Sequence, residues 1–194
     1  MDETHVVTVF LRHGADVLLL RRSDEVGSYA GLWGAVAGHA ECDPEAAARE
    51  EIREETGLDP RADVTFCRRG DSFTVEDAEL GVRWVVHPFL FEVPEHVGEE
   101  RETVEGASED PAIEPNCETS AWEWVPPTEI LRRETVPDLW RSYDAVRPTV
   151  ETVANDREHG SAWLSLRALE VLRDVAALAV ERQGGGGGGG GGGG

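Results

Sequence analysis

Three glutamates within five residues carry the clearest chemistry in this chain. Glu51, Glu54 and Glu55 lie in residues 49–58, a segment that reaches Gly57 near its end. On a helix, residues three and four positions apart share a face, so these carboxylates project together. Carboxylates that converge without matching cations repel one another, and a hard cation such as Mg²⁺ or Mn²⁺ would relieve that repulsion. Because Mg²⁺ in such sites usually also binds substrate phosphates, the segment predicts a metal–phosphate site.

The flanking sequence predicts the elements that must position these carboxylates. Residues 31–41 predict a short apolar strand bracketed by glycines and running into a loop. Asp43 is suited to cap the N-terminus of the following helix, Pro44 to occupy its first turn, and Gly57 to end it. The expected unit is strand, loop, helix and loop.

This unit resembles the signature box of the Nudix hydrolases. That box runs Gly, five residues, Glu, seven residues, then Arg-Glu-aliphatic-x-Glu-Glu-x-Gly-aliphatic. Gly38 matches the first glycine, and the remaining matches are Glu51-Ile52, Glu54-Glu55 and Gly57-Leu58. The resemblance implies that Glu51, Glu54 and Glu55 are catalytic and hold Mg²⁺ or Mn²⁺, and it places Gly38 among the substrate-binding residues.

The box departs from the family pattern in two ways. It is two residues shorter between Gly38 and Gly57, and the family arginine position is Glu50, with Arg49 one step earlier. Depending on the direction of counting, the family's loop glutamate falls on Cys42 or Pro44. The two partners of that ion pair are therefore absent together, which is better tolerated than the loss of one partner alone.

An ordinary solvated acidic helix is the alternative interpretation of this segment. Glu45 and Arg49 are spaced i,i+4, and Glu50 and Arg53 are spaced i,i+3, as on exposed helices. Gly38, the loop at residues 33–34 and Gly57 favour the metal site over this alternative.

Further candidate residues lie outside the box helix. Arg21 or Arg22 could hold a phosphate bidentately, although each is equally typical of a surface arginine at a strand end. Trp33, with Tyr29, could stack on a nucleobase or pack in the core. Glu41 could add a carboxylate to the metal cluster.

A general base is expected downstream. Glu114 and Glu118 precede Trp122 at a place where some Nudix relatives carry such a base, and we take Glu118 as the catalytic candidate. None of the six histidines has paired metal-ligand spacing, and no serine-nucleophile pattern is present.

The composition limits the partners of the chain. The net charge is −21, and all 18 cationic residues are arginine. Such a negative field argues against binding nucleic acid or anionic membranes, whereas a metal-bound nucleotide remains compatible. The absence of lysine favours a salt-adapted (halophilic) protein over an ordinary acidic one. The three cysteines indicate neither a disulfide framework nor a zinc site, and the missing signal and membrane segments predict a cytoplasmic protein.

By resemblance, residues 1–135 form the Nudix domain, an α/β/α sandwich with a mixed sheet. Apolar β-prone runs at residues 6–11 and 17–20 predict a hairpin, and further strands are expected at residues 64–66, 82–93 and 121–125. The acidic segment 94–111 is expected to be a mobile loop, and glycines 184–194 to be a tag, a linker or unidentified residues.

Residues 136–183 are expected to form a helical extension, which could be the start of a second, truncated domain. Along residues 161–182 an apolar stripe includes Leu166, Leu169, Leu172 and Val175, and we expect another surface to pack against it. That surface could belong to the Nudix domain, to a second copy of the chain or to a missing C-terminal domain. Residues 127–183, chiefly near Trp163, are similar to the N-terminal helical part of initiation factor two-B-related proteins.

The sequence therefore leaves two functions in view. The first is Mg²⁺- or Mn²⁺-dependent hydrolysis of a nucleoside diphosphate linked to another moiety. The second is a nucleotide- or sugar-phosphate-sensing module with a Nudix fold and weak turnover, which regulates a C-terminal initiation factor two-B-like or isomerase-like domain. The altered box motivates the second.

Overall fold

A computed structural model describes residues 2–94 and 110–184 of the 194-residue chain. The chain divides into two compact units, residues 1–147 and 148–194. Residues 136–147, which the sequence placed in the helical extension, belong to the first of these units. Most of the segment predicted as a mobile loop, and the glycine tail after Gly184, lie outside the described residues.

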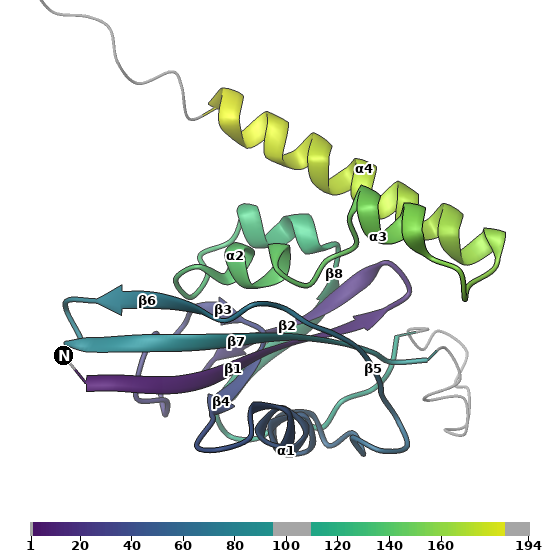
Figure 1. Cartoon of the computed structure of the whole chain (residues 1–194). Helices are drawn as coiled ribbons and strands as arrows, with labels where there is room; N and C mark the ends of the chain where they lie inside the picture. The colour runs from purple at the N-terminus through teal and green to yellow at the C-terminus, as the bar shows by residue number, and fades with distance from the viewer. Residues whose placement is uncertain (1, 95–109, 185–194) are drawn as a thin grey trace, which may run out of the picture. The chain divides into compact units, whose positions relative to one another are not determined.

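The first unit is built on one mixed sheet (Figure 1). β1 and β7 pair in parallel from Asp2 with Val82 to Arg12 with Glu92, and the other strand pairs are antiparallel. The strands are β1 (Asp2–His13), β2 (Asp16–Arg22), β3 (Trp33–Gly34), β4 (Val36–His39), β5 (Thr65–Arg69), β6 (Phe73–Asp77), β7 (Val82–Glu92) and β8 (Thr119–Val125). The predicted mixed α/β fold is confirmed; β6 is a strand that the sequence interpretation missed.

The hairpin of β1 and β2 opens into a fork. The two strands pair only next to their turn, where Arg12 faces Val17 and His13 faces Asp16. Further along, β1 pairs instead with β4, while β2 pairs with β3 and β8. The edge of the sheet therefore splits, and side chains from both arms of the fork can face one shared space.

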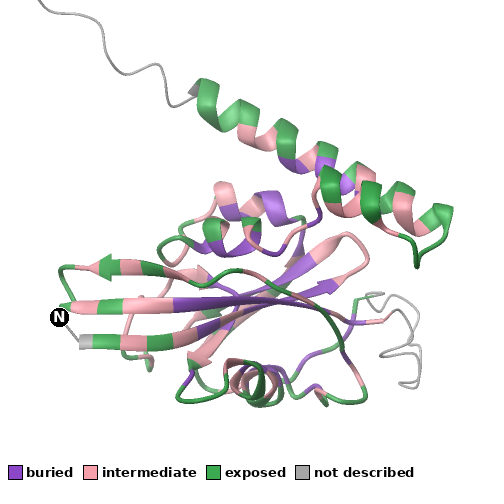
Figure 2. Ribbon diagram, viewed as in Figure 1, coloured by how far each residue is buried: buried purple, intermediate pink, exposed green. Residues whose placement is uncertain are grey.

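Each face of the sheet buries its own apolar cluster, because alternate residues of a strand point to opposite sides. Val9, Leu18 and Phe89 pack with Ile52 of helix α1 (Pro44–Thr56). Phe10 and Leu19 belong to the other cluster, with side chains from η1 (Pro127–Leu131) and α2 (Leu139–Asp144). The central strands are accordingly buried in Figure 2, and Figure 1 shows α1 and α2 on opposite faces.

Helix α1 has the ends that the sequence predicts. The Asp43 side chain accepts hydrogen bonds from the backbone N–H groups of Glu45 and Ala46, and Pro44 occupies the first turn. Gly57 ends the helix in the left-handed region at φ 73°, a conformation that glycine adopts without strain. The helix is thereby held at a fixed register, which decides the direction of each glutamate.

The second unit contains α3 (Val150–Asn155) and α4 (Ser161–Gly184). The sequence predicted α4 but not α3. The predicted apolar stripe of α4 is exposed at Leu166, Leu169, Leu172 and Val175, whereas Arg167, Glu170, Val171 and Asp174 are buried. None of the helices in the described ranges has the length and apolar character needed to cross a membrane.

Candidate active site

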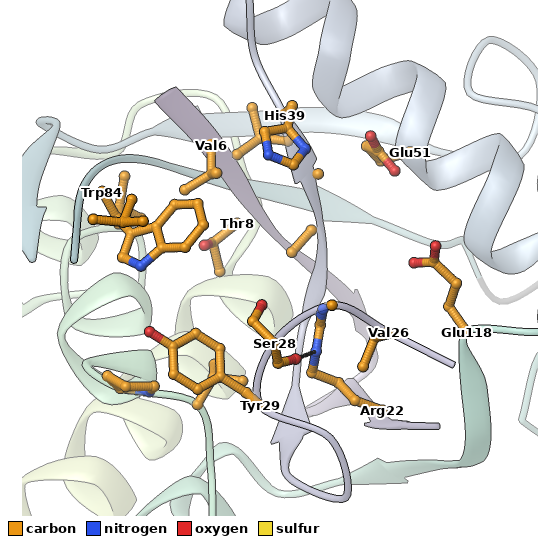
Figure 3. A pocket seen from close by; sticks show the side chains of 18 of the residues that line it. Val6, Thr8, Arg22, Val26, Ser28, Tyr29, His39, Glu51, Trp84 and Glu118 are labelled. Atoms are coloured by element: carbon orange, nitrogen blue, oxygen red, sulfur yellow. Dashed lines mark hydrogen bonds between the residues drawn. The ribbon is translucent and has the colours of Figure 1, made fainter. Parts of the chain in front are cut away.

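The fork between β1 and β2 holds a cavity of about 620 Å³ (Figure 3). Glu51 and Glu54 of α1, Glu118 from the segment before β8, and Arg22 at the end of β2 all line it. Four charged residues from three separate segments of the chain thus meet at one solvent-connected space, and three of them are carboxylates.

Glu51 lies directly against the backbone of Gly38. A Cβ atom at position 38 would overlap the Glu51 carboxylate, so any other residue there would force that carboxylate to move. Burial, with repulsion from Glu54, Glu118 and Glu50, raises the pKa of Glu51 to about 7. Glycine at position 38 therefore allows a box glutamate to approach the backbone closely.

Glu55 lies deeper than Glu51 and is only 6% exposed. Burial first, and repulsion from Glu51 second, raise the pKa of Glu55 to about 8. A backbone hydrogen bond from Ala37 N–H, 3.3 Å long, and the charge of Arg22 oppose that rise without cancelling it. Glu55 sits behind the cavity wall, since it is not among the lining residues.

Glu54 is exposed on the same helix and reaches the cavity. Its carboxylate lies 3.7 Å from Arg53, which also approaches Glu50 at 3.5 Å. Glu41, proposed from the sequence as an additional ligand, is exposed and is not among the residues that line the cavity.

The segment carrying Glu118 is tied to the site at both ends. The backbone N–H of Glu114 donates to the carbonyl of Thr56 at the end of α1, over 2.8 Å. The Ser23 N–H donates to the Glu118 carbonyl over 2.7 Å, next to the end of β2. Glu118 therefore faces the box helix, whereas Glu114 packs beside Gly57 and does not line the cavity.

Of the two candidate arginines, Arg22 faces the cavity. The pairing of β2 with β8 shifts register between Arg21 and Arg22, and such irregularities redirect side chains. Arg22 Nε donates to the Ser28 carbonyl over 2.9 Å, which leaves its terminal nitrogens for a ligand. Arg21 is exposed, and its Nε donates to the Gly31 carbonyl instead.

Trp33 packs away from the cavity. It joins the core cluster next to α2, and the Arg133 guanidinium lies 4.5 Å from its ring centre. Tyr29 does line the cavity, as do Trp84 and Asn116, which were not singled out from the sequence. One feature of the sequence could have identified Trp84: it is spaced two residues from Val82 and from Val86, so the three side chains share one face of β7.

The site suits a divalent cation chemically. Its donors are carboxylate oxygens, and no cation lies within ion-pair distance of Glu51 or Glu55 in the part of the chain that the structure describes. The negative end of the α1 dipole also favours a cation near Glu54 and Glu55. Within residues 2–94 and 110–184 no three His, Cys, Asp or Glu side chains form a complete metal-binding group. A Mg²⁺ site does not need three protein ligands, because Mg²⁺ commonly keeps several waters and uses only one or two carboxylates.

The mixed sheet between two helical layers, with an acidic helix beside an open cavity, defines an α/β sandwich with a carboxylate-lined site. The sequence model of the NUDIX domain matches residues 2–146, and the chain belongs to the Nudix family. Nudix hydrolases generally use divalent metals. No curated protein matches the chain.

Solved structures show the same fold at low sequence identity. A Nudix hydrolase from M. smegmatis, RenU, is 19% identical with a TM-score of 0.58, covering 82% of this chain and 92% of its own. A C. elegans Ap4A hydrolase in a binary complex is 16% identical with a TM-score of 0.53 (73% and 96% covered). The NUDIX domain of Shewanella oneidensis NrtR, complexed with ADP ribose, is 18% identical with a TM-score of 0.50 (75% and 86% covered).

Proposed function

We propose that this protein is a Mg²⁺- or Mn²⁺-dependent hydrolase that cleaves the diphosphate bond of a nucleoside diphosphate linked to another moiety. Glu51, Glu54 and Glu118 supply carboxylates to one cavity, and this convergence is the observation that supports the proposal most strongly. The Ap4A hydrolase and the ADP-ribose-bound domain among similar structures are compatible with a substrate of this class.

Glu51 and Glu54, which line the cavity, would hold the cation. Glu55 behind the cavity wall and Glu41 outside the cavity are the other two candidates, and each would have to move toward the cavity to bind it. The chemistry supplied by a bound Mg²⁺ or Mn²⁺ is activation of water and neutralisation of charge on the diphosphate. Gly38 serves this arrangement by leaving space for the Glu51 carboxylate.

The remaining roles fall to residues on the other side of the cavity. Arg22 presents its terminal nitrogens to a phosphate oxygen, where a guanidinium can bind bidentately. Glu118 accepts a proton from the attacking water while the oxygen of that water bonds to phosphorus. The leaving phosphate keeps the electron pair of the broken P–O bond. Trp33 and Arg21, which lie outside the cavity, take no part in this scheme.

The test is release of mononucleotide or phosphate from a panel of nucleoside-diphosphate derivatives, with Mg²⁺ or Mn²⁺ and at high salt. We expect turnover of at least one substrate, and a loss on the order of 10²–10⁴-fold in kcat for Glu118→Gln. Glu114→Gln is the matched control, because the same side chain four residues earlier does not reach the cavity. The proposal would be contradicted if no substrate were hydrolysed with either Mg²⁺ or Mn²⁺, or if Glu118→Gln and Glu114→Gln lowered kcat equally.

A second candidate function is a sensing module that binds a nucleotide or sugar phosphate without turnover. The shortened box, and the glutamate Glu50 at the position of the family arginine, favour it. Calorimetry separates the two: metal-dependent binding without product supports sensing, and steady turnover excludes it. A regulated C-terminal domain, the initiation factor two-B resemblance, a homodimer and a cytoplasmic location stay predictions.

A further inference from the structure

Two histidines meet between β1 and β7, the parallel strands that lie side by side in Figure 1. His5 Nδ1 lies 3.0 Å from His87 Nε2, and the two rings stack with their centres 5.2 Å apart. His87 is 6% exposed, whereas the His5 side chain is 44% exposed. Because alternate residues of a strand point to opposite sides, both histidines face away from Val6 and Val86, which line the cavity. The pair therefore lies outside the candidate active site, on the side of the sheet that α1 covers.

Arg69 of β5 fixes the protons of this pair. A guanidinium can only donate hydrogen bonds, and the Arg69 terminal nitrogen lies 3.4 Å from His87 Nδ1, so that Nδ1 accepts. His87 therefore carries its proton on Nε2 and donates it to His5 Nδ1. His5 in turn carries its proton on Nε2, 3.6 Å from the Glu3 carboxylate. All the donors point from Arg69 toward Glu3, and the row of contacts is complete only while both imidazoles are neutral.

A proton taken up by His5 breaks this row. It fills the Nδ1 lone pair that accepts from His87, so two N–H groups then face each other. The His5 imidazolium is attracted instead by the Glu3 carboxylate. His87 does not take the proton, because burial, then Arg69 and His5, lower its pKa below the ordinary value of 6.5. The buried N–H of His87 is thereby left without its acceptor, which is unfavourable.

The effect on stability is opposite in sign to that of the box glutamates. Since the His87 pKa is lower in the folded state, the unfolded state binds more protons just below pH 6.5. The stability contributed by neutral His87 is present above pH 6.5 and is lost as the pH falls. Glu51 and Glu55, whose pKa values are raised, respond in the other direction.

Few charged groups act on the pair. Arg69 of β5 and Glu3 of β1 are the charged side chains in contact with it in the described part of the chain. Other charged or titratable side chains of the neighbouring elements are engaged elsewhere: His39 of β4 lies beside Trp84 in the cavity (Figure 3), Arg68 of β5 binds the Arg147 carbonyl, Glu76 of β6 pairs with Arg83, and Glu45 of α1 pairs with Arg49.

The backbone beside His5 holds the start of the loop between β4 and α1 (residues 40–43). The His5 carbonyl accepts from the Ala40 N–H over 2.9 Å, and Val7 pairs with Gly38 in the register of β1 with β4. Gly38 is the residue against which the Glu51 carboxylate lies. A movement of β1 at His5 therefore reaches the glycine that fixes the position of Glu51.

We propose that His5 and His87 form a proton-operated latch, which holds the N-terminal part of β1 and the loop at residues 40–43 in place while both imidazoles are neutral. A solvent proton that binds His5 Nδ1 replaces the hydrogen bond from His87 and releases the latch, and His87 keeps its own proton. Histidine pairs can act in this way because an imidazole changes charge within the physiological pH range. The latch goes beyond the proposed function, since it operates without metal or substrate.

The first measurement is NMR of the whole ¹⁵N-labelled protein in the presence of a chelator. The imidazole ¹⁵N shifts give the tautomer of each ring, and a scalar coupling across the N–H···N bond identifies its two nitrogens. At about pH 7.5 we expect both histidines as Nε2–H tautomers, with a coupling between His87 Nε2 and His5 Nδ1. At about pH 5.5 the coupling should be lost, with His5 protonated and His87 neutral.

The second measurement is hydrogen exchange of the Ala40 N–H, which donates to the His5 carbonyl. Between about pH 7.5 and 5.5, its protection against exchange should fall about fivefold or more as the latch opens. In His5→Asn the side-chain oxygen takes the place of Nδ1 and accepts from His87 without binding a proton. Protection of Ala40 should then be the same at both pH values. His5→Leu removes the acceptor, and protection should be low at both.

His13→Asn is the matched control, because His13 lies on the same strand but its Nδ1 is 3.0 Å from the Val93 carbonyl and not from another histidine. It should respond to acid as the unaltered protein does. Arg69→Met removes the cation next to His87, so the His87 titration should move toward higher pH.

The outcomes separate the latch from other acid effects. Missing coupling near neutral pH, or an Nδ1–H tautomer of either histidine, overturns the hydrogen-bond row and the latch with it. A coupling that is lost in acid while Ala40 protection stays constant leaves only a local contact, and it also overturns the latch. If protection fell equally in His5→Asn, the change would belong to Glu51 and Glu55, which titrate in the same range. None of these readouts uses turnover, so failure of the latch and failure of the proposed hydrolysis are distinguishable.

Discussion

Helices α1 and α4 both bury carboxylates, but only α4 provides the cations for them. Glu170 and Asp174 of α4 are 3% and 0% exposed, and arginines of the same helix neutralise them. Arg167 lies 2.9 Å from Glu170, and Arg173 lies 3.0 Å from Asp174. Glu51 and Glu55 of α1 have no such partner within ion-pair distance in the described chain, and each has a raised pKa.

The difference separates a structural ion pair from a binding site. A buried carboxylate beside its own arginine is already compensated, so it has little to gain from a ligand. Buried carboxylates that repel each other store an unfavourable energy, which a proton or a divalent cation can remove. Perturbed carboxyl groups in a cavity are for this reason candidates for function, whereas the more deeply buried acids of α4 are not.

The comparison predicts opposite consequences for the same substitution in the two helices. Glu51→Gln should lower metal-dependent kcat by about 10²–10⁴-fold, because it removes a carboxylate from the cavity. Glu170→Gln should leave kcat unchanged. Both variants are assayed with saturating Mn²⁺ at a temperature well below their melting transitions.

Glu50→Gln controls for the charge of α1, since Glu50 is exposed on the same helix and pairs with Arg53. It should retain nearly full activity. If Glu50→Gln were as damaging as Glu51→Gln, the acidic helix would act through its total charge and not through a site.

Stability should change in the reverse order. Glu170→Gln removes the carboxylate that lies 2.9 Å from the buried Arg167, and breaking a buried pair in this way costs about 3–5 kcal/mol. Glu55→Gln removes a repulsion that exists once Glu55 is deprotonated, so above the Glu55 pKa of about 8, and without divalent cations, it should raise the free energy of unfolding. Denaturant unfolding in the presence of a chelator measures both, and a loss of stability in Glu55→Gln would show that its charge is compensated after all.

The pH dependence follows from the same contrast. The folded-state pKa values of Glu51 and Glu55, about 7 and about 8, lie above the ordinary value of 4.5. Between roughly pH 4.5 and 8 the folded state therefore binds more protons than the unfolded state, and stability falls as pH rises. The melting temperature of the metal-free protein should be lower at pH 8.5 than at pH 6, by about 4 °C or more.

Divalent cations should weaken that pH dependence, because they bind the deprotonated carboxylates and only in the folded state. The stabilisation by Mn²⁺ should accordingly grow from pH 6 to pH 8.5. Differential scanning calorimetry with chelator or Mn²⁺ gives both curves. The metal-free slope should become shallower in a Glu51→Gln, Glu55→Gln double variant, and an unchanged slope would assign it to other groups.

The same helices show what the sequence can and cannot predict. For α1 the prediction is confirmed from Asp43 to Gly57, because caps and glycine stops act over a few residues. The choice of Arg22 over Arg21 depends on a register shift between β2 and β8, and the position of Trp84 in the cavity depends on the pairing of β6 with β7. Alternation along residues 82–86 can predict the strand face that carries Trp84, but it cannot predict which distant segments that face meets. For α4 the apolar stripe was read correctly, but the helix buries its charged side.

Salt should stabilise the protein through a different mechanism from that of the metal. With a net charge of −21, the negative side chains of the folded protein repel one another in dilute buffer. At molar salt the Debye length falls to about 3 Å, which screens that repulsion. The melting temperature should rise with KCl into the molar range and rise again with Mg²⁺. The KCl increment should survive in a Glu51→Gln, Glu54→Gln, Glu55→Gln triple variant, and the Mg²⁺ increment should vanish. A melting temperature that does not respond to KCl would remove the halophilic interpretation.

The smallest effect is expected from the exposed apolar face of α4. Ile52 of α1 is fully buried, whereas Leu169 and Leu172 of α4 are 63% and 65% exposed. Ile52→Ala should cost about 2–5 kcal/mol, because it opens a cavity in the core. Leu169→Ala should change the free energy of unfolding by no more than about 0.5 kcal/mol, as for surface positions generally. Thermal unfolding over a hundredfold range of protein concentration checks both. If Leu169→Ala lowered the melting temperature only at high concentration, a second copy would cover this face; a loss as large as that of Ile52→Ala at every concentration would mean that the chain itself buries Leu169.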